Sequence, residues 1–532
     1  MFKQVTITGL LCIIFIVSLT GQNYDYSWIK QFGSYSDESG YNINVDDEQN
    51  IYLTGTFSYT ADFIDTVLVS YGSNDGFLAK FDSVGNLIWI VQFGGDNSDE
   101  GTLIDFDSND NVILGGMFHS DTAYIGDTAL FSCGCSDFTF IAKYSKNGDF
   151  IWANEIIGDG SVQIKGLAVV PGDSVIATGF YFHSAYFEND TIYPNGLSDI
   201  FIVKYGPDGN EKWHRQFGGT NLDMAYDLVA NGNNIYITGS FKNKVTFGTD
   251  MVISRGASDV FLLKTNQFGD PLWAVSFGSA GSDEALAMTL DADNNLIITG
   301  YGGDSLYFGG NYISSAGGSN FILSKFDSSG NPLWCKMAGG IFDDMGLDVS
   351  CNQDNRIFVT GKFMDTLNID TNQLVTNYYS DIFFAEFYPD GNSRWVKQIH
   401  SEKNDEGTAI LYANNSIYLT GHFRDTALFD TNEYYSYGGS DIFFARLLNG
   451  LFVNYSEPFN TNMFVYPNPA KYIINISGFE NCYFVQLYNS SAIMLLQSDK
   501  ENIYIEDLPS GLYFLRILSE NKVVKTGKII KL

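Results

Sequence analysis

Residues 89–95 read Trp-Ile-Val-Gln-Phe-Gly-Gly, and residues 213–219 read Trp-His-Arg-Gln-Phe-Gly-Gly. The tryptophan that opens this stretch recurs along the chain at gaps of 60 to 63 residues. All seven tryptophans follow the pattern: Trp28, Trp89, Trp152, Trp213, Trp273, Trp334 and Trp395. A fixed period of this length indicates a repeat architecture.

Two further markers keep the same phase. A glycine follows an apolar strand in every copy: Gly55, Gly116, Gly179, Gly239, Gly300, Gly361 and Gly421. Several copies also begin a strand with an acid, as at residues 75–80 (Asp-Gly-Phe-Leu-Ala-Lys) and 259–264 (Asp-Val-Phe-Leu-Leu-Lys). Because three markers agree, the repeat is the strongest signal in the sequence.

Each copy predicts four short strands, which in the first are residues 40–45, 51–57, 77–81 and a strand around Trp89. Aromatic and β-branched residues alternate with polar ones, and turns rich in Asn, Asp and Gly separate them. Seven such units predict an all-β fold, a seven-bladed β-propeller of four-stranded blades over residues 22–450. No Trp strand follows residues 441–448, so we expect the strand of Trp28 to close the last blade. The repeated Trp and Phe side chains are expected to form the core between blades.

The repeats resemble the SBBP β-propeller repeats of secreted bacterial proteins. The resemblance rests on Trp-x-x-Gln-Phe-Gly-Gly at 89–95 and 213–219, on Asn-Ile-Tyr-x-Thr-Gly-x-Phe at 50–57 and 234–241, and on the Asp-x-Phe strands. It covers about residues 22–450. It implies the architecture and no particular activity.

Composition limits the partners of the chain. With 29 Lys and Arg against 62 Asp and Glu, the 532 residues carry a formal net charge of −33. This acidity argues against nucleic acid and against anionic lipid surfaces, which require a basic face. A hydrophobic content of 45% excludes a disordered chain.

Residues 1–21 predict a cleaved secretory signal peptide, because Lys3 precedes an apolar run from Val5 to Leu19 and Gly21 follows it. A membrane anchor is the alternative, although polar residues interrupt the run. We expect no transmembrane segment in the mature chain. The cysteines beyond the predicted signal peptide are Cys133, Cys135, Cys335, Cys351 and Cys482. They are too scattered for a disulfide framework, and the sequence allows one optional bridge, between Cys335 and Cys351.

The period stops after Leu448. Residues 451–462 form a polar linker, and residues 463–532 predict a small Ig-like β-sandwich. This segment resembles the type A C-terminal sorting domain of the type IX secretion system of Bacteroidota. The resemblance rests on Tyr-Pro-Asn-Pro at 466–469, Leu-Pro-Ser-Gly-Leu-Tyr at 508–513 and the Lys-rich strand 522–531. It implies contact with the type IX secretion machinery and a protein that is secreted or anchored at the outer-membrane surface.

An acidic residue follows most of the tryptophans by nine or ten positions: Asp37, Asp99, Asp223, Asp283, Asp343 and Asp405. A second acid follows several of them, at Glu38, Glu100, Glu284, Asp344 and Glu406. The repeat predicts a ring of carboxylates on one face of the disc, which either holds calcium or a cationic ligand or caps the loops locally. Calcium is the single cofactor that the sequence suggests.

The sequence Asp-Thr followed by an apolar residue recurs and resembles the O-glycosylation sequon of Bacteroidota. Its threonines are Thr66, Thr122, Thr128, Thr191, Thr366 and Thr426. The alternative is a turn that leads into a strand.

The usual catalytic motifs are missing: we find no His-Glu-x-x-His, no Gly-x-Ser-x-Gly and no phosphate-binding Gly-Lys loop. We therefore name no catalytic residue and expect a non-catalytic surface protein whose loops bind glycan or matrix. One alternative is a polysaccharide-active enzyme with its site at the mouth of the propeller channel. The other is a passive component of the surface layer.

Overall fold

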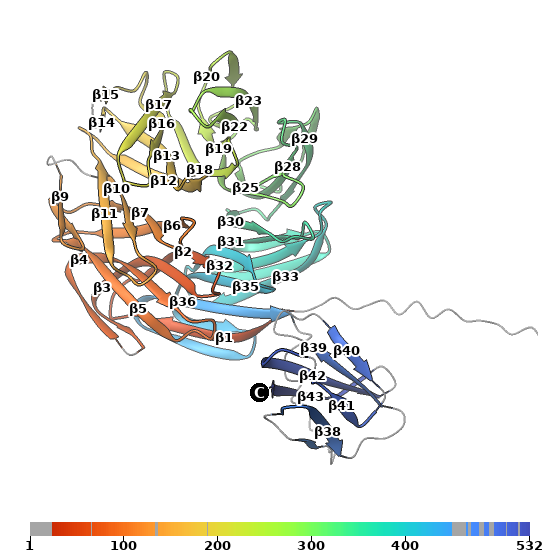
Figure 1. Ribbon diagram of the computed structural model, residues 1–532. Helices are drawn as coiled ribbons and strands as arrows, with labels where there is room; N and C mark the ends of the chain where they lie inside the picture. The colour runs from red at the N-terminus through yellow and green to blue at the C-terminus, as the bar shows by residue number, and fades with distance from the viewer. Residues whose placement is uncertain are drawn as a thin grey trace, which may run out of the picture. The chain divides into compact units, whose positions relative to one another are not determined.

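The computed structural model describes residues 24–64, 66–132, 137–188 and 190–449 of the repeat region. In the C-terminal part it describes residues 464–466, 470–477, 483–488, 494–498, 500–506, 508–519 and 522–531. The described residues form 43 β-strands and no helix (Figure 1). They separate into two compact units. One consists of residues 26–448, and the other of residues 24–25 together with the described residues from 449 onward.

The first blade shows how a repeat folds. Strands β2 (Ser39–Val45), β3 (Ile51–Phe63), β4 (Thr66–Phe81) and β5 (Leu87–Gly95) pair in this order, each antiparallel to the next. Gln49 and Gly85 lie in the connecting turns at φ of 67° and 82°, the left-handed conformation that tight turns require. In the two central strands, residues 51–58 and 75–81 are buried without interruption, so both faces of these segments are covered.

Six further units repeat this order. The second is β6 (Asp99–Phe106), β7 (Val112–Phe118), β10 (Phe138–Tyr144) and β11 (Phe150–Ile156). The third is β12 (Val162–Val170), β13 (Ser174–Phe182), β16 (Ser198–Tyr205) and β17 (Glu211–Phe217), and the fourth is β18 (Asp223–Asn231), β19 (Asn234–Phe241), β22 (Asp259–Asn266) and β23 (Pro271–Phe277). The fifth is β24 (Asp283–Leu290), β25 (Leu296–Gly302), β28 (Asn320–Phe326) and β29 (Pro332–Ala338). The sixth is β30 (Met345–Cys351), β31 (Ile357–Ile369), β32 (Asn372–Phe387) and β33 (Ser393–Ser401).

The seventh unit closes the ring. Strands β34 (Glu406–Ala413), β35 (Ser416–Phe429) and β36 (Asn432–Asn449) receive the N-terminal strand β1 (Tyr24–Phe32) as their fourth strand, beside β36. The first strand of each unit contacts the first strand of the next, and β34 contacts β2. At that closing contact, the Thr408 hydroxyl donates to the Gly40 carbonyl over 2.5 Å. The N-terminal strand therefore completes the last sheet, as the sequence predicts (Figure 1).

The tryptophans join neighbouring blades. Trp89 packs against Gly148 in the last turn of the next blade, and its Nε1 donates to the Lys146 carbonyl of that turn over 3.2 Å. A Cβ on Gly148 would lie 3.0 Å from the indole, and its φ is 89°, so the position requires glycine. The same glycine–tryptophan contact recurs for Trp28, Trp152, Trp213, Trp273 and Trp334. The predicted position of tryptophan between blades is confirmed for these six, whereas Trp395 donates to Glu386 of its own blade.

Short outer hairpins also link the blades, and the sequence did not predict them. They are β8–β9 (Thr122–Ile125, Thr128–Phe131), β14–β15 (Ala185–Phe187, Asp190–Ile192), β20–β21 (Lys244–Phe247, Asp250–Ile253) and β26–β27 (Leu306–Phe308, Asn311–Ile313). In the other three blades the same hairpin continues β3–β4, β31–β32 and β35–β36. Each one lies against the fourth strand of the preceding blade, as in the pairs Gly94–Tyr124 and His400–Leu428.

The C-terminal unit contains two antiparallel sheets. One consists of β37 (Phe464–Tyr466), β38 (Ile473–Ser477) and β41 (Asn502–Tyr504), and the other of β40 (Met494–Ser498), β39 (Tyr483–Tyr488), β42 (Gly511–Ser519) and β43 (Lys522–Lys531). Both contribute to one buried cluster, which includes Ile474, Val485 and Leu515. This unit thus has its own hydrophobic core.

Some predictions fall outside the described residues: the signal peptide 1–21, the loop with Cys133 and Cys135, Cys482 and the linker 451–462. Cys335 and Cys351 are described, and both are free thiols. The suggested bridge between them is therefore not formed.

Candidate functional site

A buried carboxylate does recur at the start of the first strand of most blades, but its register differs from the prediction in two of them. The buried members are Glu38, Asp99, Asp223, Asp283, Asp344 and Asp405, and the third blade has Val162 instead. The predicted Asp37 and Asp343 are the exposed neighbours of Glu38 and Asp344. Asp37 pairs with Arg424, and Asp343 accepts the Ser319 N–H over 2.9 Å.

Each of these acids meets a second buried group across the junction with the preceding blade. The pairs are Asp75 with Asp99, Asp199 with Asp223, Asp259 with Asp283, Asp381 with Asp405, Asp441 with Glu38, and Asn320 with Asp344. We call the acids of these pairs, without Asn320, the junction carboxylates. A Cβ on Gly94 would lie 3.0 Å from both Asp75 Oδ1 and Asp99 Oδ2, so this glycine lets the two acids approach.

Burial raises the pKa of these acids. The pKa rises to about 6 for Asp75, to about 7 for Asp344 and Asp441, and to about 8 for Asp405. Hydrogen bonds oppose the shift without cancelling it: Asp99 Oδ2, for example, accepts the Gly95 N–H and the Ser120 hydroxyl, each over 2.7 Å. Carboxylate oxygens that accept such hydrogen bonds stabilise the junctions between the blades.

The arrangement does not gather these acids into a metal cage. Among the described residues no group of three or more His, Cys, Asp or Glu side chains is placed to hold a metal ion. Calcium binding by the predicted ring stays an untested prediction.

The glutamine of the Trp-x-x-Gln stretch serves the same junctions. Gln216 Nε2 donates to Asp199 Oδ2 and to the Tyr193 carbonyl, each over 2.7 Å. Gln31, Gln92 and Gln398 make the equivalent pair of bonds in their own blades. The motif marks the repeat in the sequence, but its spacing alone did not predict that the glutamine donates to a buried junction carboxylate.

A second group of polar side chains lies next to the inner strands, around the axis of the propeller. We call it the axial cluster: Ser39, Tyr41, Glu100, Lys165, Lys362, Glu406 and His422. Most of its members come from the first strand of a blade, directly after the junction carboxylate or at a β-bulge that follows it. The bulge inserts one extra residue, such as Tyr41 or Lys165, and so turns a side chain that regular alternation would place elsewhere.

One half of the cluster joins blades 1, 2 and 3. Burial raises the pKa of Glu100, although the charge of Lys165 and a hydrogen bond from Tyr41 oppose the shift. Burial lowers the pKa of Lys165, opposed by Glu100 and then Asp137. Asp137 is itself paired with His119, whose Nε2 lies 3.0 Å from Asp137 Oδ1. The half-cluster thus combines a carboxyl, an amine and a phenol, and Asp137 connects it to the imidazole of His119.

The other half joins blades 6, 7 and 1. Lys362 pairs with Glu406, and the Ser39 hydroxyl lies 2.9 Å from His422 Nδ1. Burial lowers the pKa of His422, opposed by the charge of Glu406. The two halves meet on β2, because Tyr41 also feels the charge of Glu406. Hydroxyl, acidic and basic groups therefore follow one another along this arc of the axis.

Three more carboxylates link inner strands of neighbouring blades. Asp105, Asp227 and Asp348 accept the N–H groups of Val169, Met288 and Ile410, each over 2.7 Å. Burial raises their pKa values to about 6, about 8 and about 7. These bonds fix the inner strands that carry the axial cluster.

The threonines of the Asp-Thr sequences all lie on the outer hairpins. Thr122, Thr366 and Thr426 are on the first strand of a hairpin, and Thr66, Thr128 and Thr191 are on the second. All six are partly exposed. Asp365 and Asp425 adopt φ of 66° and 63° at bulges, which supports a turn role at these two positions.

Family models match two parts of the chain. Residues 27–56 match a model described as "Beta-propeller repeat", and residues 464–532 match one described as "Secretion system C-terminal sorting domain". No helix among the described residues is both long and apolar enough to span a membrane.

Curated relatives are distant and much longer. The chain is 24% identical over 435 residues to an uncharacterized WD repeat-containing protein of Acanthamoeba polyphaga mimivirus, covering 63% of this chain and 31% of that protein. It is 22% identical over 324 residues to the regulatory protein FlaEY of Caulobacter vibrioides, covering 55% and 33%. The chain therefore spans about a third of the length of both.

Solved structures resemble the chain at low scores. PorZ, a surface component of the type IX secretion system of Porphyromonas gingivalis, has a TM-score of 0.31 at 12% identity, covering 92% of this chain and 70% of that one. Quinohemoprotein alcohol dehydrogenase from Comamonas testosteroni has a TM-score of 0.38 at 10% identity, covering 85% and 79%. The chain is an all-β propeller protein that carries a type IX C-terminal sorting domain, and this domain indicates export to the cell surface or outer membrane.

Proposed function

We propose that the exported protein is a non-catalytic binding protein whose ligand is a neutral or cationic glycan held at the axial cluster. The observation that carries the proposal is the series of interacting donors and acceptors formed by Lys165, Glu100, Tyr41, Glu406 and Lys362, in this order. Alternating donors and acceptors suit the hydroxyl groups of a sugar, each of which both donates and accepts. The net charge of −33 disfavours an acidic polysaccharide.

A glycan array probed with the full chain tests this function. We expect binding to a limited set of neutral or amino-sugar glycans, and at least a tenfold loss of affinity in the double variant Glu100→Gln/Lys165→Met, about 1.4 kcal/mol. The matched control is Tyr312→Phe, because Tyr312 is 75% exposed on an outer hairpin away from the inner strands. Equal binding by all three proteins would place the ligand elsewhere.

A second candidate is hydrolysis of a polysaccharide at the same cluster. It is favoured by Glu100, whose raised pKa suits a general acid, and by Glu406 on the other side of Tyr41 as the second carboxylate. Release of reducing ends by the full chain, abolished in Glu100→Gln, would favour the enzyme. If neither glycan binding, hydrolysis nor bound metal is detected, the passive surface role is preferred.

The Asp-Thr threonines complete the proposal as glycan acceptors on the outer hairpins. Their partial exposure is compatible with modification. Intact-mass and peptide analysis of the protein from its native source tests this: unmodified Thr66, Thr122, Thr128, Thr191, Thr366 and Thr426 would leave them as turn residues.

A further inference from the structure

A basic residue near the end of the third strand recurs in six of the seven blades, and in three of them it has an acidic partner. In blades 1, 2 and 5 the partner is the aspartate that directly follows the first strand. Lys80, Lys143 and Lys325 each place Nζ 2.7 to 3.2 Å from an Asp oxygen. These partners are Asp46, Asp107 and Asp291, which are fully or almost fully buried.

Blade 3 keeps the lysine and lacks the aspartate. Its basic residue is Lys204, and the position of the aspartate is taken by Val170. Blade 4 also lacks the aspartate, but there Lys264 donates to the Ser328 carbonyl over 3.2 Å. Within the described part of the chain, the ammonium group of Lys204 has neither a hydrogen bond nor an ion pair, although its backbone pairs with β13 and β17. It is partly buried, and burial lowers its pKa.

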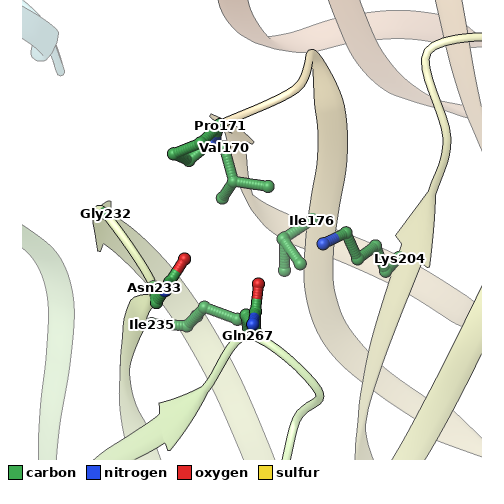
Figure 2. A pocket seen from close by; sticks show the side chains of 8 residues that line it. All are labelled: Val170, Pro171, Ile176, Lys204, Gly232, Asn233, Ile235 and Gln267. Carbon is green, nitrogen blue, oxygen red and sulfur yellow. The ribbon is translucent and has the colours of Figure 1, made fainter.

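A small cavity lies beside this lysine, between blades 3 and 4. Its volume is about 10 Å³, and Val170, Lys204, Asn233 and Gln267 are among the residues that line it. Figure 2 shows the amino end of Lys204 directed past Ile176 toward the space enclosed by these side chains. A volume of this size admits one atom group about as large as a water molecule.

The cavity therefore combines an ammonium group without a counterion and two amide side chains in the place where other blades hold a carboxylate. We propose that this cavity binds a carboxylate, one oxygen of which enters beside Lys204 and substitutes for the missing aspartate. The carboxylate belongs either to a small organic acid or to the C-terminus of a peptide. An ammonium and amide N–H groups are donors that a carboxylate oxygen accepts.

Lysine NMR of the full chain tests the proposal. Reductive ¹³C-dimethylation keeps the amine charged, and loss of one signal in Lys204→Arg assigns its resonance. We expect acetate at constant ionic strength to shift the Lys204 signal with millimolar affinity and to raise the pKa of Lys204. The Lys264 signal should not respond. An acetate effect no larger than that of chloride would overturn the assignment of a carboxylate site.

A matched pair of variants provides an independent test. Val170→Asp supplies the carboxylate from the chain, so Lys204 should resemble the acetate-saturated state and acetate should have no further effect. In Val170→Asn the new side chain has nearly the shape of aspartate but no charge, and blade 4 has an asparagine, Asn231, at the same position. This variant should still respond to acetate. If both variants block acetate equally, the proposal is wrong. A third measurement compares acetate with a peptide that has a free C-terminal carboxylate and with the same peptide amidated at its C-terminus. Tighter binding of the free peptide than of acetate, with no binding of the amidated peptide, identifies a protein partner. Equal affinities of the free peptide and acetate identify a small acid.

Discussion

Gln216 Nε2 donates to Asp199 Oδ2 over 2.7 Å and so ties the fourth strand of blade 3 to the start of its third strand. The same amide donates to the Tyr193 carbonyl at the outer edge of the blade. Asp199 is fully buried, and its Oδ1 has no hydrogen-bond partner. The glutamine is thus a principal donor to a buried carboxylate.

Replacing Gln216 by Leu should destabilise the propeller by about 1–3 kcal/mol, because the buried Asp199 Oδ2 loses one of its donors and keeps those of Asn195. The midpoint of urea unfolding measures the effect. The control is Gln373→Leu, an exposed amide that donates to Asn368 Oδ1, with an expected change below about 0.5 kcal/mol. Equal effects of both substitutions would show that the bond to Asp199 contributes nothing specific.

The junction carboxylates should make the protein more stable at pH 5 than at pH 8. Burial raises the pKa of Asp441 to about 7 and of Asp405 to about 8, so the folded state binds protons that the unfolded state has released. The stability from these groups is fully present below the unfolded pKa of about 4 and is lost as the pH rises through 7 to 8. Calorimetric Tm values at constant ionic strength measure this slope.

Asp405→Asn separates this effect from the general charge of the chain. The amide does not ionise, so the variant should gain stability relative to the natural protein as the pH rises from 5 to 8. Asp327→Asn is the control: hydrogen bonds from Asn331 lower the pKa of Asp327, so this carboxyl is ionised in both states from pH 5 to 8 and its replacement should leave the slope unchanged. Parallel Tm curves for Asp405→Asn and the natural protein would contradict the assignment.

Closure of the ring depends on the N-terminal strand. Phe32 on β1 is fully buried, with ring centroids 5.3 Å from Phe63 and 5.6 Å from Phe81 in blade 1. Phe32→Ala should cost about 3–5 kcal/mol through the cavity it leaves. Tyr35→Ala, which removes a side chain 92% exposed, should have little effect. A small loss for Phe32→Ala in thermal unfolding would mean that the first strand does not hold the last blade to the first.

The thiols of Cys335 and Cys351 should resist alkylation in the folded protein. Burial raises the pKa of both thiols, so the reactive thiolate is scarce at neutral pH. Peptide mapping after iodoacetamide treatment should show both residues unmodified without denaturant and fully modified in guanidinium chloride. Modification of either residue in the native state would indicate that the blade opens locally.

The repeat could be predicted from the sequence because each of its markers meets a local physical requirement. A turn at positive φ against an indole accepts only glycine, so a glycine follows the tryptophan by 56 to 59 residues in every copy that has this contact. The closing strand followed from the phase of these markers. The outer hairpins were missed because their strands are short and the residues between them change from blade to blade.

The carboxylate ring was predicted at one residue from its true position in two blades. Asp37-Glu38 and Asp343-Asp344 are acidic doublets, and the spacing alone does not say which acid points inward. The axial cluster was missed for a related reason. Tyr41 and Lys165 lie at bulges, where the alternation of strand faces is interrupted, so a period of two assigns them to the wrong face.

The outer hairpins should protect the propeller from fragmentation by proteases outside the cell. Because a hairpin is paired with the blade before it, a cut in one surface turn leaves both fragments bound by strands on either side. An extracellular protease that nicks the disc should therefore fail to release a blade, and the nicked protein should migrate intact until it is denatured.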